Sequence, residues 1–304
     1  MLGRAVLWLA DVPFVQRMVT RGRFSRPMVE RFVAGDRLED AVAAIARLNQ
    51  KGIGGILDLL GEGVKDPAGA SQAAEEYRRS IQAARAAGID TTISVKPTQL
   101  GLAFDRWACL GHLRTLASEA RAAGMTLEID MEQSSYVSDT LAVFRALRQE
   151  GAGQVRLAIQ AYLHRTLEDL EAMRDLAPRV RLVKGAYKEP PEVAIQSKAA
   201  IDRRYRQLAA WLFDQGTDPG IATHDQRLIE HAGELARERG LTRRSFELQM
   251  LYGVRRDLQE ELARRGYRVR VYVPFGSHWY PYLSRRIAER PANLLFVMRA
   301  AAGG

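Results

Sequence analysis

Cysteine is nearly absent from this sequence. Cys109 is the only one among 304 residues, so no disulfide can form within the chain, and a cysteine-ligated zinc or iron–sulfur site is excluded. No other metal-binding motif occurs, and we predict no metal site. Low cysteine usage is typical of a reducing compartment, which favours a cytoplasmic location.

Long apolar runs are absent as well. No segment reaches 18 uninterrupted apolar residues, so we expect no membrane-spanning helix. The apolar stretch at residues 5–10 is followed at once by Asp11 and Pro13, and it lacks the small-residue cleavage pattern of a secretory signal. We therefore expect an N-terminal helix there.

Lysine is scarce, although the chain is basic. Only six of its 45 basic residues are lysine, and the formal net charge is +9. Most arginines lie among glutamate and alanine in helix-like runs such as residues 234–239, which is typical of a solvated helix surface with ion pairs. Attraction to nucleic acid or to an anionic membrane is the alternative. No basic stripe interleaved with aromatic residues occurs, so we expect no nucleic-acid partner.

Several nucleotide-binding and catalytic motifs are also missing. Gly52, Gly54 and Gly55 do not have the G-x-G-x-x-G spacing, and no P-loop, H-E-x-x-H or G-x-S-x-G motif occurs. If the protein binds a dinucleotide, a Rossmann fold does not hold it.

What the sequence does contain is a regular alternation of short β-rich runs and helix-period stretches after about residue 50. The β-rich runs are residues 53–60, 91–96, 125–131, 154–161, 179–187, 219–224, 246–252 and 268–274. The helical stretches are residues 71–87, 107–123, 138–149, 166–176, 197–215, 226–239, 255–265 and 279–290. Glycines that suit helix C-termini stand at positions 88, 124, 151, 216, 240 and 266.

Eight strands alternating with eight helices predict parallel βαβ units in an α/β fold. Eight strands also close a (β/α)8 TIM-type barrel, which we predict; an open doubly wound sheet is the alternative but usually has fewer strands. Residues 1–50 predict two or three helices, with Asp36 as the N-cap of the run from Leu38 to Asn49. No flexible linker follows them, so we predict an N-terminal helical arm at 1–50 and a barrel domain at 51–304.

Catalytic residues of such barrels lie at the carboxyl ends of the strands and in the loops that follow. In this sequence the rule selects Lys96, Asp130, Arg181 and Lys184. Each alone is more typical of a surface or capping residue, but together they gather both signs of charge at one barrel end, where burial without a ligand is costly. One interpretation is a Schiff-base aldolase or lyase with Lys96 or Lys184 as its nucleophile.

Several strings at these positions resemble a known family. Residues 94–96 (SVK), 129–132 (IDME), 181–187 (RLVKGAY), 222–224 (ATH) and 280–289 (YPYLSRRIAE) are similar, in order, to motifs of proline dehydrogenase. The resemblance runs from about Arg31 to Arg299, and the length matches the compact monofunctional bacterial members.

The resemblance implies an FAD-dependent oxidation of L-proline to Δ1-pyrroline-5-carboxylate, with hydride passing from proline C5 to flavin N5 and electrons passing on to a quinone. It implies that Arg285 and Arg286 grip the proline carboxylate, which agrees with the directional bonds that paired guanidiniums form. Lys96 would contact the substrate near its carboxylate. Three residues would enclose the pyrrolidine ring: Tyr272, Tyr282 and Leu251.

By the same resemblance, Asp130 and Arg181 form the catalytic pair, with Arg181 donating a hydrogen bond to flavin N5. The FAD would be lined by Met131, Gln160, Lys184, Gly185, Ala186, Thr223 and His224. Lys184 and His224 would offset pyrophosphate charge, and Gly185 would allow close backbone approach. Lys188 and Asp225 depart from the family pattern, where tryptophan and asparagine are common, so the adenine end is expected to be held differently.

The basic charge would help such an enzyme meet a quinone pool at an anionic membrane surface. We therefore expect a cytoplasmic protein with peripheral contact to the inner face of the membrane. The sequence leaves open its oligomeric state, the physiological acceptor and any activity on hydroxyproline.

Overall fold

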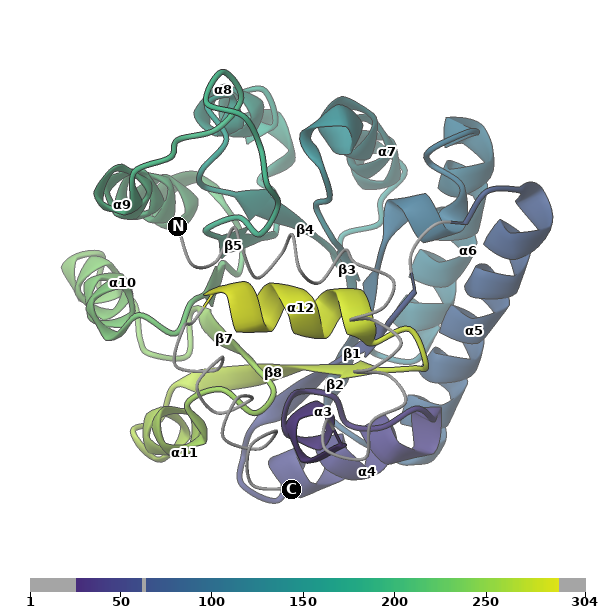
Figure 1. Ribbon diagram of the computed structural model, residues 1–304. Helices are drawn as coiled ribbons and strands as arrows, with labels where there is room; N and C mark the ends of the chain where they lie inside the picture. The colour runs from purple at the N-terminus through teal and green to yellow at the C-terminus, as the bar shows by residue number, and fades with distance from the viewer. Residues whose placement is uncertain (1–25, 62–63, 290–304) are drawn as a thin grey trace.

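The computed structural model describes residues 26–61 and 64–289, which form a closed barrel of eight parallel strands (Figure 1). Each strand pairs with the next one along the chain, and β8 pairs with β1, which closes the sheet. The strands are β1 (Gly54–Leu59), β2 (Thr91–Val95), β3 (Leu127–Ile129), β4 (Val155–Gln160), β5 (Val180–Val183), β6 (Gly220–Ala222), β7 (Glu247–Leu251) and β8 (Arg268–Phe275). The predicted (β/α)8 barrel is confirmed, and the open sheet is excluded.

Helices cover the outside of this barrel at the predicted places (Figure 1). They are α5 (Pro67–Ala86), α6 (Arg106–Ala122), α7 (Val137–Gln149), α8 (Thr166–Glu171), α9 (Lys198–Gln215), α10 (Gln226–Glu238) and α11 (Arg256–Arg264). Short 3-10 turns lie at Pro97–Leu100, Ser134–Tyr136 and Arg174–Leu176. Asp66, Asp105 and Asp225 start three of the helices, because each carboxylate accepts a backbone N–H of the first turn.

Two predictions about helix ends were wrong. Gly216 has φ −90° and ψ 175°, which is not the left-handed conformation expected of a C-terminal glycine. Glycine suits this position because a larger residue would clash there: a Cβ would lie 2.8 Å from the carbonyl oxygen of Leu212. The N-cap of α4 (Leu38–Asn49) is Arg37 rather than Asp36, and Oδ2 of Asp40 accepts the Arg37 backbone N–H at 3.2 Å.

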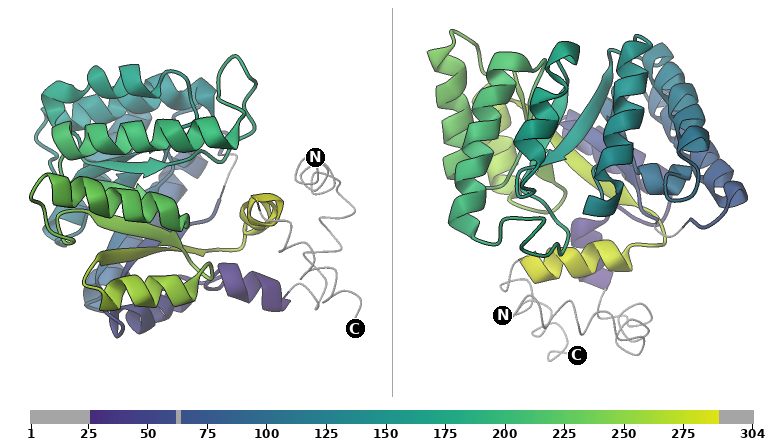
Figure 2. Two further views of the ribbon diagram at one scale, coloured as in Figure 1. Left: turned by 90° about the vertical axis from the view of Figure 1, so that its left-hand side faces the viewer. Right: turned by 90° about the horizontal axis from the view of Figure 1, so that it is seen from above.

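Among the described residues, the helices α3 (Arg26–Phe32) and α4 before the barrel and a helix after β8 complete the fold. In α4, Ile45 packs so tightly on β1 that a Cβ on Gly55 would lie 2.5 Å from its side chain. After β8 the chain turns into α12 (Tyr280–Glu289), which runs across the carboxyl end of the barrel (Figures 1 and 2). A hydrophobic cluster joins α12 to the end of α3 and to the residue after β1. Its members are Phe32, Val33, Leu60, Tyr282 and Leu283. Residues 1–25 of the predicted arm lie outside the described part, and the domain boundary at residue 50 stays a prediction.

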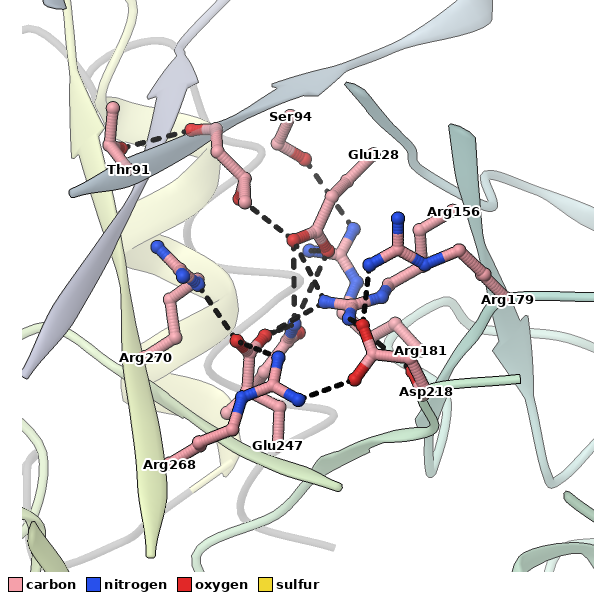
Figure 3. A network of polar contacts seen from close by, with 12 residues as sticks. Thr91, Ser94, Glu128, Arg156, Arg179, Arg181, Asp218, Glu247, Arg268 and Arg270 are labelled. Atoms are coloured by element: carbon pink, nitrogen blue, oxygen red, sulfur yellow. Dashed lines mark hydrogen bonds and ion pairs between the residues drawn. The ribbon is translucent and has the colours of Figure 1, made fainter. Parts of the chain in front are cut away.

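Several strands are apolar on one face and polar or charged on the other. On β3, Leu127 and Ile129 join the hydrophobic cluster shared with the helices, whereas Glu128 contacts residues of other strands across the barrel interior. A TIM barrel interior is usually packed with branched apolar side chains. In this barrel an ion-pair network fills much of that space (Figure 3).

Arg156 is the centre of this interior network. Its side chain is 1% exposed, and Nη1 lies 2.8 Å from Glu247 and 3.3 Å from Glu128, while Nη2 lies 2.7 Å from Asp218. Glu247 also forms ion pairs with Arg270, whose Nε lies 3.0 Å from Oε2, and with Arg268, whose Nη2 lies 3.3 Å from it. Every buried charge of this group therefore has a partner of opposite sign, which is the condition under which buried ions are tolerated.

The network predicts a loss of stability in acid. Burial alone would raise the pKa of Glu247, but Arg270 and Arg156 outweigh it and hold that pKa far below its ordinary value of 4.5. Glu247 therefore stabilises the fold fully above about pH 4.5, and this contribution is lost as the pH falls towards the folded-state pKa. We expect denaturant unfolding from pH 7 to pH 3 to show a steep loss in the wild type and a shallower one in Glu247→Gln. If the free energy of unfolding falls equally with pH in the two proteins, Glu247 is not the cause of the acid loss.

Candidate functional site

A cavity of about 720 Å³ opens at the carboxyl ends of the strands, on the side that α12 crosses. Its size is typical of a ligand site. Thirteen of the predicted site residues line it together: Lys96, Asp130, Met131, Gln160, Arg181, Lys184, Gly185, Ala186, Thr223, His224, Leu251, Tyr272 and Tyr282. Arg285 and Arg286 belong to α12, but their side chains lie outside the described part.

Asp130, directly after β3, is the point where most polar contacts of the cavity floor converge. Its Oδ1 accepts a short hydrogen bond from Arg181 Nη2 and one of 2.8 Å from Ser94 Oγ. Its Oδ2 accepts from Tyr272 Oη at 2.8 Å and lies 3.3 Å from Lys96 Nζ. Burial opposes ionisation, but Arg181 and Lys96 outweigh it and hold the pKa of Asp130 below its ordinary value. Asp130 is therefore a fixed anion that orients a guanidinium, an ammonium and a phenol.

Lys96 follows β2 and lies between two carboxylates. Its ammonium forms a short contact with Asp58 and the 3.3 Å ion pair with Asp130. Burial would lower its pKa, but the carboxylates, led by Asp58, raise it well above the ordinary value. A lysine nucleophile needs a neutral amine. Lys96 is thus suited to bind an anion rather than to form a Schiff base, and Lys184 is held by Asp202 at 2.5 Å and Asp225 at 3.2 Å.

Asp58, near the end of β1, is a cavity residue that the sequence reasoning missed. It is 1% exposed, and burial, followed by the nearby charge of Asp130, raises its pKa despite Lys96. The available signal was an aspartate at the penultimate position of an otherwise apolar strand, opposite Ser94 in the register of β1 and β2. The pKa of Asp58 and that of Asp130 are therefore displaced in opposite directions, because burial outweighs the cation at Asp58 and the cations outweigh burial at Asp130.

The segment after β5 forms a loop, which corrects the prediction of a strand over 179–187. β5 ends at Val183, and Gly185 has φ +122°, a conformation that interrupts a strand. A Cβ on Gly185 would lie 2.2 Å from the ring of Tyr162. The need for glycine at this position therefore comes from its φ angle and from Tyr162.

The contacts of His224 and Lys184 alter the charges expected of them. His224 Nε2 accepts the backbone N–H of Leu251 at 2.9 Å, so the ring is neutral and offers a hydrogen bond rather than a full charge. Lys184 forms ion pairs with two carboxylates, those of Asp202 and Asp225, which offset its positive charge. Lys198, at the start of α9, lines the cavity and was not anticipated, whereas Lys188 is exposed and lies outside it.

The cavity has the chemistry to hold a large polar cofactor. Two of its lining residues each carry a buried polar atom that lacks a hydrogen-bond partner among the described residues: Asp58 Oδ2 and Gln249 Oε1. Buried polar atoms are normally paired, so such a group at one cavity indicates a ligand. The volume, the cationic side chains of Arg181 and Lys198 and the glycine-containing loop fit a flavin dinucleotide. Within the described residues no cluster of three or more His, Cys, Asp or Glu side chains is arranged to hold a metal ion.

Comparison with known proteins gives consistent matches over most of the chain. The profile of the family described as proline dehydrogenase matches residues 41–299. The chain is 41% identical over 305 residues to the proline dehydrogenase of Deinococcus radiodurans, with 99% of this chain and 98% of that protein covered. It is 43% identical over 269 residues to proline dehydrogenase 1 of Bacillus subtilis, with 88% and 89% covered.

Solved structures resemble this barrel as well. A crystal structure of proline utilization A from Bdellovibrio bacteriovorus matches with a TM-score of 0.83 at 22% identity, covering 94% of this chain and 38% of that chain. At that identity the likeness concerns the fold alone. A proline utilization A mutant from Bradyrhizobium japonicum matches with a TM-score of 0.76 at 26% identity, covering 94% and 34%. The chain thus spans little more than a third of these solved chains.

Proposed function

The chain belongs to the proline dehydrogenase family, and from this premise we propose how its barrel mouth performs the reaction. The enzyme oxidises proline to Δ1-pyrroline-5-carboxylate and uses FAD. When bound, the flavin supplies the acceptor for the hydride that leaves proline C5. The observation that carries the proposal is the convergence of Arg181, Lys96 and Tyr272 on the one carboxylate of Asp130 at the cavity floor.

Asp130 and Arg181 are the catalytic pair in this proposal. The negative charge of Asp130 fixes the Arg181 guanidinium, which is only 4% exposed, beneath the cavity. With FAD bound, Arg181 would offer a fixed hydrogen-bond donor to flavin N5, the atom that would accept the hydride. A preorganised donor in a water-poor site stabilises developing charge more than a mobile one does.

The substrate is held by its carboxylate and enclosed by apolar surface. Arg285 and Arg286 of α12, with the ammonium of Lys96, bind the carboxylate. Tyr272, Tyr282 and Leu251 enclose the pyrrolidine ring, and all three line the cavity. Holding the carboxylate at a fixed distance from the ring orients C5, and such orientation contributes several kcal/mol to rate enhancement.

FAD is held by the rest of the cavity wall in this proposal. Met131, Gln160, the loop at 184–186 and the pair Thr223 and His224 line it. The Gln160 side chain donates to the backbone carbonyl of Glu132 at 2.8 Å, which fixes its orientation. Lys198 joins the set as a cation for the pyrophosphate, since Lys184 is engaged by Asp202 and Asp225.

Adding proline without oxygen tests the function directly. We expect the absorbance band of the bound flavin to bleach on anaerobic addition of proline and to return with a quinone.

Arg285→Met and Arg286→Met should raise the apparent KM for proline strongly while the flavin content stays unchanged. A yellow protein that proline does not bleach would refute the function, and normal proline saturation in both variants would refute the carboxylate assignment.

We further propose that the electrons pass to a quinone at an anionic membrane surface, reached by the basic exterior of the protein. No helix among the described residues is both long and apolar enough to cross a bilayer, so the contact proposed is peripheral. Co-sedimentation with vesicles should increase with the fraction of anionic lipid and fall with salt. Sedimentation that ignores lipid charge would contradict the proposal.

A further inference from the structure

Two carboxylates hold Arg181, and only one of them belongs to the cavity. Nη2 of Arg181 binds Asp130, and Nη1 lies 3.3 Å from Oε2 of Glu128. Glu128 is completely buried and is not among the cavity residues. It stands two residues before Asp130, and side chains two apart on a strand share one face. Both carboxylates therefore reach Arg181 from the inner face of the barrel, one layer apart. Figure 3 shows Glu128 and Arg181 within the interior network.

The Glu128 side chain is itself held by neighbours in the barrel interior. Its Oε1 accepts from Thr92 Oγ1 at 2.7 Å and lies 3.3 Å from Arg156 Nη1, at the centre of the interior network. The other oxygen, Oε2, is the one that faces Arg181. The ring of Tyr272 covers the guanidinium, with Cζ 5.4 Å from the ring centroid. Arg181 thus meets a carboxylate at each terminal nitrogen and an aromatic face beside them.

We propose that Glu128 is a positioning residue for the reaction, holding Nη1 of Arg181 so that the guanidinium keeps the orientation that the cavity requires. This inference rests on the role of Arg181 proposed above. A guanidinium bound to one carboxylate through one nitrogen can still turn about that contact. A second carboxylate facing the other nitrogen opposes that rotation by its charge, because the terminal nitrogens of arginine lie in one rigid plane and turning it would separate the ion pair. The interior network therefore meets the cavity at two residues: Gln249, whose Nε2 donates to Glu247 at 2.8 Å, and Arg181, which pairs with Glu128.

The test compares Glu128→Gln with Glu247→Gln in the flavin-loaded enzyme. Both variants remove one buried carboxylate that binds Arg156, but only Glu128 touches Arg181. We expect Glu128→Gln to lower kcat at least tenfold with KM for proline within twofold. The midpoint potential of the flavin should become more negative by about 30 mV, a tenfold change for two electrons, because a loosened donor stabilises the electron-rich flavin less. Glu247→Gln should leave both quantities unchanged.

Other outcomes would overturn the proposal in distinguishable ways. An unchanged kcat and potential in Glu128→Gln, or equal changes in Glu247→Gln, would show that Glu128 only supports the fold. A more positive potential would show that Glu128 acts by its charge and not by holding Arg181. Arg181→Lys distinguishes failure of the proposed role of Arg181 from failure of the role of Glu128. If neither Glu128→Gln nor Arg181→Lys changes kcat or the flavin potential, the proposed role of Arg181 is wrong. If Arg181→Lys changes them and Glu128→Gln does not, only the role of Glu128 is refuted.

A milder variant keeps the test decisive if Glu128→Gln does not fold. Thr92→Val removes the hydroxyl that anchors Oε1 of Glu128 and leaves every charge in place. We expect kcat and the potential to change in the same direction as in Glu128→Gln, by about twofold to threefold in kcat. Values equal to the wild type in a folded, flavin-loaded Thr92→Val protein would count against the proposal.

Discussion

Asp130→Asn is expected to lower kcat for proline about 100-fold while the protein stays folded and flavin-loaded. The amide has almost the shape of the carboxylate but cannot neutralise Arg181 and Lys96, and its NH2 group would face donors instead of accepting from them. Displacement of a catalytic group by about 1 Å can cost a factor of 100 in rate. Steady-state kinetics and the rate of flavin reduction by proline, measured in a stopped-flow instrument, provide the check.

Asp218→Asn is the matched control for that variant. Asp218 is also a partly buried aspartate that binds arginines, since Arg156, Arg179 and Arg268 all contact it, but it lies on the loop before β6, at the opposite end of the barrel from the cavity. Its replacement should lower the midpoint of unfolding and leave the rate of flavin reduction near that of the wild type. An Asp130→Asn enzyme with kcat within threefold of the wild type would show that Asp130 does not organise the site.

The order of the strands and helices could be predicted because the local signals agree with one another. Each strand presents an apolar face to the helices, and most of the intervening helices end at a glycine in the left-handed conformation, as at Gly88 and Gly124. The residues that the resemblance selected line one cavity wherever their side chains are described, and their roles stay predictions. These parts depend on neighbours in sequence or on motifs, which is why one sequence suffices for them.

The interior network is formed by residues that are distant in sequence and close in space. The sequence indicates which arginines face inwards but not which carboxylates they contact. On β8, Arg268, Arg270 and Tyr272 alternate with valines. Because helices cover the outer face of a barrel, this alternation already indicates that the arginines face inwards. Their partners cannot be read in the same way, since Glu247 meets Arg270 only through the register of β7 and β8. The role of Asp58 could not be predicted for the same reason, because it depends on Lys96, which directly follows the neighbouring strand β2.

Arg156→Met is expected to cause the largest loss of stability, about 3–5 kcal/mol, which is the usual cost of removing one partner of a buried ion pair. The change leaves Glu128 and Glu247 without their shared cation in the barrel interior, although Arg270 still binds Glu247. Native proteins are stable by only about 5–15 kcal/mol, so this loss is a large fraction of the total. Denaturant unfolding of the wild type and the variant at pH 7 measures the difference.

The cost of Arg156→Met comes from the stranded carboxylates rather than from lost packing, and a second substitution separates these causes. In the double variant Arg156→Met with Glu128→Gln, one stranded charge is gone, so the free energy of unfolding should recover in part instead of falling by the sum of the two single losses. The difference between Arg156→Met and the wild type should also narrow as the pH falls, because protonation neutralises Glu247, whose low pKa depends in part on Arg156. Additive losses that do not change with pH would mean that Arg156 contributes mainly through its volume, and the barrel interior would then be a packed core rather than an electrostatic support for Arg181.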